Sequence, residues 1–167
     1  MSSNSLHEPA DLRAAQSRLN ELGTARSTAA VAERADLLRV LGRLDEALAT
    51  AEESYRLAFF TGDREDVTAA RLRRARVLQD MGTLDRALTE VKACRQAART
   101  ENWGELEASA LYQQASVLVD LRRLEEARST ISELVGLRAS QGAPPEQLAA
   151  LDDALEIIMR RMLTESA

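Results

Sequence analysis

A period of forty residues constrains the fold of this chain more than any other feature of its sequence. Three eight-residue segments align without a gap, each starting forty residues after the one before: 41–48, 81–88 and 121–128. The register also extends upstream, where alanine and leucine recur at fixed positions: Ala35, Ala75 and Ala115, then Leu38, Leu78 and Leu118. Self-similarity at such a period is typical of solenoids, in which each repeat buries its apolar face against its neighbours. The sequence therefore predicts stacked units of one kind.

Each unit has the pattern of a helix pair. Apolar residues recur at helical spacing before the shared turn, as in Leu72, Ala75 and Leu78. Gly42 and Gly82 then break the helix and let the chain reverse. At the end of each unit stand Gly62, Asn102 and Gly142, which tolerate the positive φ of a helix-ending turn. Ala, Leu, Arg and Glu, which favour helices, are abundant, whereas aromatic residues make up only 3%. The fold class that we expect is all-α.

Both flanks of the three pairs have helical patterns of their own. Residues 9–22 carry apolar residues at helical spacing and resemble a lone second helix. Pro144 and Pro145 begin a final helix whose outer face is polar, which suits a terminal cap. We expect a flexible leader (1–8) followed by a single domain (9–163) of about eight helices. The domain consists of a half-repeat (9–23), three helix pairs (25–62, 64–102 and 104–142) and a capping helix (144–163).

The repeated residues resemble those of the tetratricopeptide repeat family. The resemblance rests on a small residue in the first helix, a turn glycine, a bulky residue two positions on and an alanine in the second helix: Ala35, Ala75, Ala115; Gly42, Gly82; Leu44, Leu84, Leu124; Ala47, Ala87, Ala127. The period is longer than the family's usual period of about 34 residues, and the closing proline and first-helix tryptophan are absent. The chain is thus similar to the long-repeat variant over roughly residues 25 to 140. The resemblance implies a right-handed α-α superhelix.

The resemblance also implies a binding face, because the first helices of such solenoids line a concave surface. Residues three and four apart share one stripe of a helix, and on this stripe the chemistry varies between repeats. The predicted partner-binding residues are Asp36, Arg39, Leu72, Arg73, Arg76, Gln79, Tyr112, Ser116 and Val119. Arginines here can hold acidic side chains or a C-terminal carboxylate by forked hydrogen bonds. Alternatively they are solvated or lie with their stems along the core, a reading that applies most to Arg71 and Arg74.

The sequence contains no pattern typical of catalysis. His7 is the only histidine and falls in the leader, and Cys94 is the only cysteine. Cys94 corresponds to Ser54 and Leu134, which predicts a small residue buried at a helix contact, with a reactive thiol as the alternative. There is no phosphate-binding glycine loop, metal-ligand spacing or dinucleotide fingerprint. We therefore expect that the protein is not an enzyme, has no catalytic residues and binds no metal or cofactor.

The few aromatic residues have packing roles as their simplest explanation. Tyr55, Phe59 and Phe60 fall at the end of the second helix of repeat one. We expect them to fill space between helix pairs. Trp103 precedes the third repeat, where it is expected to pack against the next helix, with a role as a partner-binding hot spot as the alternative.

Charge and composition limit the kinds of partner that the chain can bind and indicate where in the cell it acts. The net charge of −5 and the pI of about 5.1 disfavour nucleic acids and anionic membranes. The N-terminus lacks the features of a signal peptide, no apolar run approaches the roughly 18 residues of a membrane span, and a single cysteine fits a reducing compartment. Lys92 is the only lysine among 22 basic residues, a bias typical of GC-rich coding. We expect a cytoplasmic bacterial protein.

The function that these observations favour is a non-enzymatic scaffold or adaptor. Its partner is expected to be another protein or a peptide segment, acidic segments included, bound on the concave face. Two alternatives remain open. The first is a regulatory module that responds to a ligand or peptide, and the second is a self-assembling structural protein, such as a homodimer.

Overall fold

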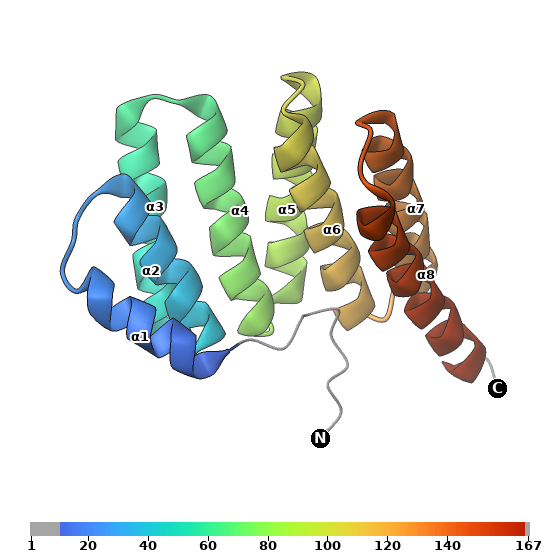
Figure 1. Ribbon diagram of the computed structural model, residues 1–167, viewed down its shortest axis with the longest axis horizontal. Helices are drawn as coiled ribbons and strands as arrows, with labels where there is room; N and C mark the ends of the chain where they lie inside the picture. The colour runs from blue at the N-terminus through green and yellow to red at the C-terminus, as the bar shows by residue number, and fades with distance from the viewer. Residues whose placement is uncertain (1–10, 166–167) are drawn as a thin grey trace. The chain divides into compact units, whose positions relative to one another are not determined.

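The computed structural model describes residues 11–165, and these residues form eight α-helices and no strand (Figure 1). The all-α prediction is thus confirmed. The helices are α1 (Leu12–Leu22), α2 (Thr28–Val40), α3 (Leu44–Thr61), α4 (Arg64–Asp80), α5 (Leu84–Thr100), α6 (Gly104–Asp120), α7 (Leu124–Ser140) and α8 (Pro145–Glu165). The predicted leader, with His7, lies outside the described residues. No helix within residues 11–165 is both long and apolar enough to cross a membrane.

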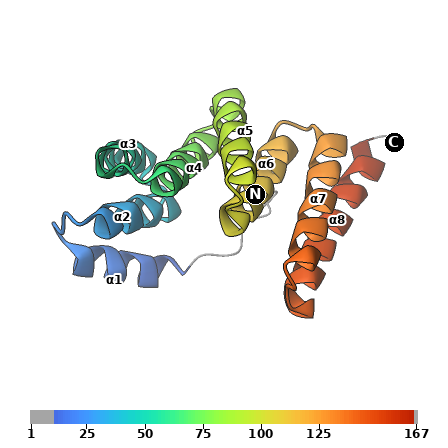
Figure 2. The same ribbon diagram turned by 90° about the horizontal axis from the view of Figure 1, so that it is seen from above.

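Helices that follow one another in the sequence pack against each other. The packed pairs include α1 with α2, α2 with α3, α3 with α4, α6 with α7, and α7 with α8. Figures 1 and 2 both show α7 and α8 side by side along their length. The chain divides into two compact units, one ending at Glu90 and the other beginning at Val91, so that the division falls inside α5.

The turn within each helix pair has the same hydrogen bonding in all three repeats. Gly42, Gly82 and Arg122 adopt positive φ angles of 73°, 79° and 60°. The amide of the next residue then donates to the carbonyl five residues before it: Arg43 to Leu38, Thr83 to Leu78 and Arg123 to Leu118, each at 2.9 Å. This is the Schellman arrangement that ends many helices. Arg122 takes the glycine position with a full side chain, which strains its backbone.

Burial follows the forty-residue register. The second helix of repeat one buries Ala47, Ala51, Ser54 and Ala58, and that of repeat two buries the residues forty positions later: Ala87, Val91, Cys94 and Ala98. Ala35, Ala75 and Ala115 on the first helices have no exposed surface. Only small side chains let two helix axes approach closely at such crossings. The packing position predicted for Cys94 is confirmed, because its side chain is buried.

The prediction that the aromatic residues of α3 fill the core is wrong for two of them. Phe59 and Phe60 are 65% and 85% exposed. They follow the buried Ala58 by one and two residues, and helical geometry turns these positions away from the stripe that packs. Tyr55 is half-buried, with the Arg74 guanidinium 4.7 Å from its ring centroid. Trp103 is half-buried directly before α6.

Candidate partner-binding site

The candidate site lies where α2 and α4, which contact each other, present charged residues. Each helix has a defined start: the Ser27 hydroxyl accepts from the Ala30 amide at 3.2 Å, and the Asp63 carboxylate accepts from the first-turn amides of α4. These caps set the register in which the charged stripe runs. On α2 the stripe carries Asp36 and Arg39, and on α4 it carries Arg73, Arg76 and Asp80.

Two ion pairs cross-link the helices in opposite directions. Arg73 Nε donates to Asp36 Oδ2 at 3.1 Å, and Arg39 Nη1 donates to Asp80 Oδ2 at 2.9 Å. Each helix thus supplies one acid and one arginine, and the pairs hold the site's side chains in place. Asp80 was not among the predicted residues, although it follows Arg76 by four positions on the same stripe, which is a signal that the sequence carries.

Arg76 lies half-buried near these pairs and takes part in none of the hydrogen bonds or ion pairs of residues 11–165. Burial lowers the pKa of Arg76, Asp36 raises it in part, and Arg39 and Arg73 lower it further. A guanidinium stays charged in spite of such effects. The site therefore holds a cation partly out of water without a direct counter-ion, an arrangement that a bound anion would stabilise.

Two further polar atoms of the site are buried without a hydrogen-bond partner. They are Asp36 Oδ1, an acceptor, and Arg39 Nε, a donor. Buried polar atoms are seldom left in this state, since each costs about 1 to 3 kcal/mol. Neither atom has accessible surface, so of the unpaired groups at the site it is the half-buried Arg76 that a partner can reach. A carboxylate matches the planar donor geometry of arginine best.

The other predicted site residues divide into two groups. Leu72 and Gln79 on α4 are 2% and 4% exposed, so the accessible part of the predicted face in this unit is its charged part. Tyr112, Ser116 and Val119 belong to the other unit, on α6, where Tyr112 is half-buried and the other two are buried. The structure thus brings together four of the predicted residues: Asp36, Arg39, Arg73 and Arg76.

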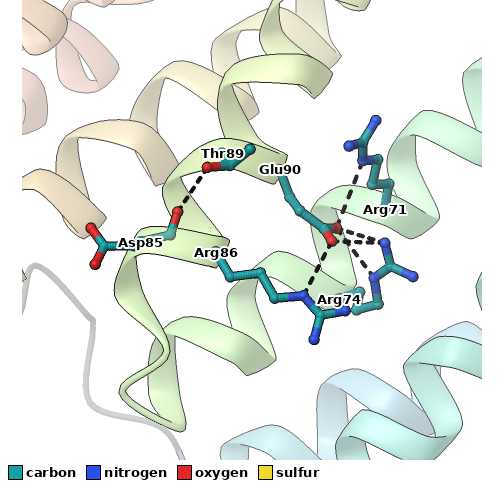
Figure 3. A network of polar contacts seen from close by, with 6 residues as sticks. All are labelled: Arg71, Arg74, Asp85, Arg86, Thr89 and Glu90. Atoms are coloured by element: carbon teal, nitrogen blue, oxygen red, sulfur yellow. Dashed lines mark hydrogen bonds and ion pairs between the residues drawn. The ribbon is translucent and has the colours of Figure 1, made fainter.

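A second charged cluster surrounds Glu90 on α5 (Figure 3). Glu90 is only 7% exposed. Arg74 Nη2 donates to both carboxylate oxygens, at 2.9 and 2.7 Å, while Arg71 and Arg86 form longer ion pairs at 3.7 and 3.8 Å. Arg74 is therefore paired to an acid rather than solvated or merely lying along the core. Sequence reasoning missed this pair because Glu90 is sixteen positions away on another helix.

The chemistry that the described residues offer is that of charge and hydrogen bonding. Within residues 11–165 no group of three or more His, Cys, Asp or Glu side chains is placed to hold a metal ion. The Cys94 thiol is buried. No protein-family model matches this chain, and no curated protein is significantly similar to it in sequence.

Proposed function

We propose that this protein is a non-enzymatic, tetratricopeptide-like scaffold of the bacterial cytoplasm that binds a protein or peptide partner at the α2–α4 site. The observation that carries the proposal is Arg76, a half-buried guanidinium without a direct counter-ion. An acidic side chain or C-terminal carboxylate of a partner would supply the missing charge and accept forked hydrogen bonds. The expected partner segment is therefore acidic.

The ion pairs around Arg76 support this function by limiting the entropy lost on binding. Arg39 and Arg73 are already held by Asp80 and Asp36, so fewer side chains have to be ordered when a partner arrives. The site is nevertheless small, with few residues to contact a partner. We expect an affinity on the order of micromolar, about −8 kcal/mol.

Selection from a displayed random peptide library tests the proposal. The wild type is expected to enrich acidic peptides, and Arg76→Glu should lose them because it reverses the charge at the site. Arg56→Glu is the matched control, since Arg56 is exposed on α3 and the substitution changes the net charge equally. Isothermal titration with the best peptide then measures each variant. Equal affinities for the two variants would overturn the proposal.

Self-assembly is a second candidate function, favoured by α8. This helix packs on α7 through Leu151, Ala154 and Ile158 but leaves other apolar side chains exposed: Ile157 at 44%, Met159 at 51% and Leu163 at 74%. Met159 and Leu163 are four residues apart and therefore share one face of the helix, and a contiguous exposed apolar patch is typical of association surfaces. Sedimentation equilibrium checks this function. A dimer that Leu163→Glu dissociates supports it, and a wild-type monomer at high micromolar concentration excludes it.

A further inference from the structure

Repeats one and two place an arginine at the same register position, Arg34 and Arg74, forty residues apart. In repeat two the facing position on the second helix is Glu90, whose carboxylate accepts two bonds from Arg74 Nη2. In repeat one the residue at that position is Thr50. Thr50 is shorter and carries no charge, so the place that the Glu90 carboxylate fills in repeat two has no equivalent group in repeat one.

A hollow of about 400 Å³ lies at this place in repeat one. It is lined by residues of α1, α2, α3 and the adjoining turns, all within the unit that ends at Glu90: Gln16, Leu19, Asn20, Gly23, Arg34, Leu38, Arg43, Glu46, Ala49 and Thr50. Cavities of a few hundred Å³ are the usual size of small-molecule sites. Leu19, Leu38 and Ala49 give the hollow an apolar part, and Arg34 gives it a charged part.

The hydrogen bonds of the hollow leave donors for an anion. Arg34 uses Nη2 to donate to the carbonyls of Gly23 and Ala25, at 2.9 and 2.7 Å, which fixes the guanidinium. None of the other bonds formed by residues 11–165 involves its Nε or Nη1. Asn20 accepts from Gln16 Nε2 through its amide oxygen, so its amide nitrogen also remains a donor. The Thr50 hydroxyl donates to the Glu46 carbonyl of its own helix.

The charges that line the hollow sum to one positive unit. Arg43 and Glu46 pair with each other through two bonds of 2.8 and 2.6 Å and offset each other. The bonds from Arg43 hold the pKa of Glu46 below its usual value, so this acid remains ionised beside its partner. Arg34 is the charge left over. A small anion with a short apolar part fits both features of the hollow.

We propose that this hollow binds a short aliphatic carboxylate, whose carboxylate group takes the place that Glu90 occupies in repeat two. Arg34 holds the carboxylate by charge-assisted hydrogen bonds, and the leucines receive the aliphatic part. The site shares no residue with the α2–α4 site, so the proposal stands apart from the scaffold function. The proposed small-molecule site exists because repeat one has Thr50 at the position where repeat two has Glu90.

Titration with sodium propionate, against sodium chloride at equal ionic strength, tests the proposal by calorimetry and thermal unfolding. The wild type is expected to bind propionate and to melt at a higher temperature in its presence. Arg34→Gln should weaken binding by at least about tenfold, since it removes the charge from the hydrogen bond. Thr50→Glu should abolish binding, because the new glutamate carboxylate pairs with Arg34 in place of propionate. Equal propionate responses in the wild type and in either folded variant overturn the proposal.

Glu90→Ala provides a positive control within the same chain. It opens the equivalent hollow beside Arg74, so it should gain a second response to propionate. Arg34→Gln combined with Glu90→Ala should keep only that second response, which shows that the loss in Arg34→Gln is local and not a failure to fold. A combined variant that keeps both responses contradicts the assignment to Arg34.

The same titration with N-acetylglutamate amide tells two sources of the carboxylate apart. Binding of both compounds, each weakened by Arg34→Gln, assigns the site to an acidic side chain of a partner as well as to free acids. Binding of propionate alone assigns it to a free acid. Failure of both compounds to bind overturns the proposal and leaves the α2–α4 site unaffected, because Arg76 lies outside this hollow.

Discussion

Repeats one and two present the same arginine to two different surroundings. Arg74 is bound by Glu90, an acid from its own repeat, whereas Arg34 donates to two turn carbonyls and lines a hollow. Repeat three replaces both charges: Gln114 Nε2 donates to Thr130 Oγ1 at 3.5 Å. The buried alanines fix where the helices lie in each repeat, and this one facing pair is free to change its chemistry.

The comparison also shows that such a pair changes as a unit. The carboxylate of Glu90 can be almost entirely buried because Arg74 donates to both of its oxygens and Arg71 and Arg86 add longer ion pairs. Thr50 needs no partner, since its hydroxyl donates to the carbonyl four residues before it. Neither residue can therefore be moved to the other repeat without a consequence for the arginine that faces it.

The largest effect is expected from Glu90→Ala, which removes the acid and leaves Arg74 without its bidentate partner. Breaking a buried ion pair from one side should lower the free energy of unfolding by about 3 kcal/mol. The matched change Thr50→Ala in repeat one should lower it by less than about 0.5 kcal/mol. Urea unfolding followed by circular dichroism measures both. Equal losses of stability in Glu90→Ala and Thr50→Ala would show that Glu90 does not stabilise repeat two more than Thr50 stabilises repeat one.

A smaller loss is expected from Arg74→Gln. Glu90 keeps its ion pairs with Arg71 and Arg86 in this variant, so part of the stabilisation remains. We expect a loss of about 2 kcal/mol for Arg74→Gln and about 1 kcal/mol for Arg34→Gln, whose bonds are to exposed turn carbonyls. The same unfolding measurement ranks them. A larger loss of stability for Arg34→Gln than for Arg74→Gln would contradict the prediction that the arginine of repeat two contributes more.

Substitutions in two of the turns are expected to change the free energy of unfolding in opposite directions. Gly82→Ala places a side chain at a φ of 79° and should lower the free energy of unfolding by about 1 kcal/mol. Arg122→Gly should raise it by up to about 1 kcal/mol, because it relieves that strain in repeat three. The exposed ion pair of Arg122 with Glu165 that is lost contributes little. Thermal unfolding gives both signs, and destabilisation by Arg122→Gly would show that backbone strain does not dominate there.

A small gain in stability is expected from Thr50→Glu, which copies the acid of repeat two into repeat one. An added pair with Arg34 should raise the free energy of unfolding by about 0.5 kcal/mol. The gain is small because Glu46 lies one turn away on the same face and repels the new carboxylate. Chemical unfolding at low and high salt checks this prediction. The gain should shrink with salt, and a loss of stability at low salt would contradict it.

Much of the fold could be predicted from the period alone. The six helices of the three pairs, the turn positions of Gly42 and Gly82 and the buried alanines follow from one register, and the two flanking helices follow from the spacing of their own apolar residues. The surroundings of a helix face could not be predicted in this way, because periodicity relates a residue to its own helix and not to what packs beyond it. Leu72 and Gln79 share the stripe of Arg76 but are buried, and Phe59 and Phe60 are apolar but exposed.

The candidate site could be predicted in part for the same reason. Helical spacing grouped Asp36 with Arg39, Arg73 was predicted to border the stripe that carries Arg76, and the structure places these four residues together. Which arginine pairs with which acid depends on side-chain reach between helices, so the two cross-links and the unpaired state of Arg76 became visible only in three dimensions. The hollow beside Arg34 could not be predicted either, because it is lined by residues of three different helices and the turns between them.

The alanines at the helix contacts have a thermodynamic consequence. Ala35, Ala47, Ala51 and Ala75 are fully buried, yet each removes much less apolar surface from water than a leucine would. The heat capacity change of unfolding grows with the apolar area exposed. A chain whose close contacts are made by methyl groups should therefore have a small heat capacity change for its length. Its stability should depend only weakly on temperature, on the cold side of its optimum as well as on the warm side.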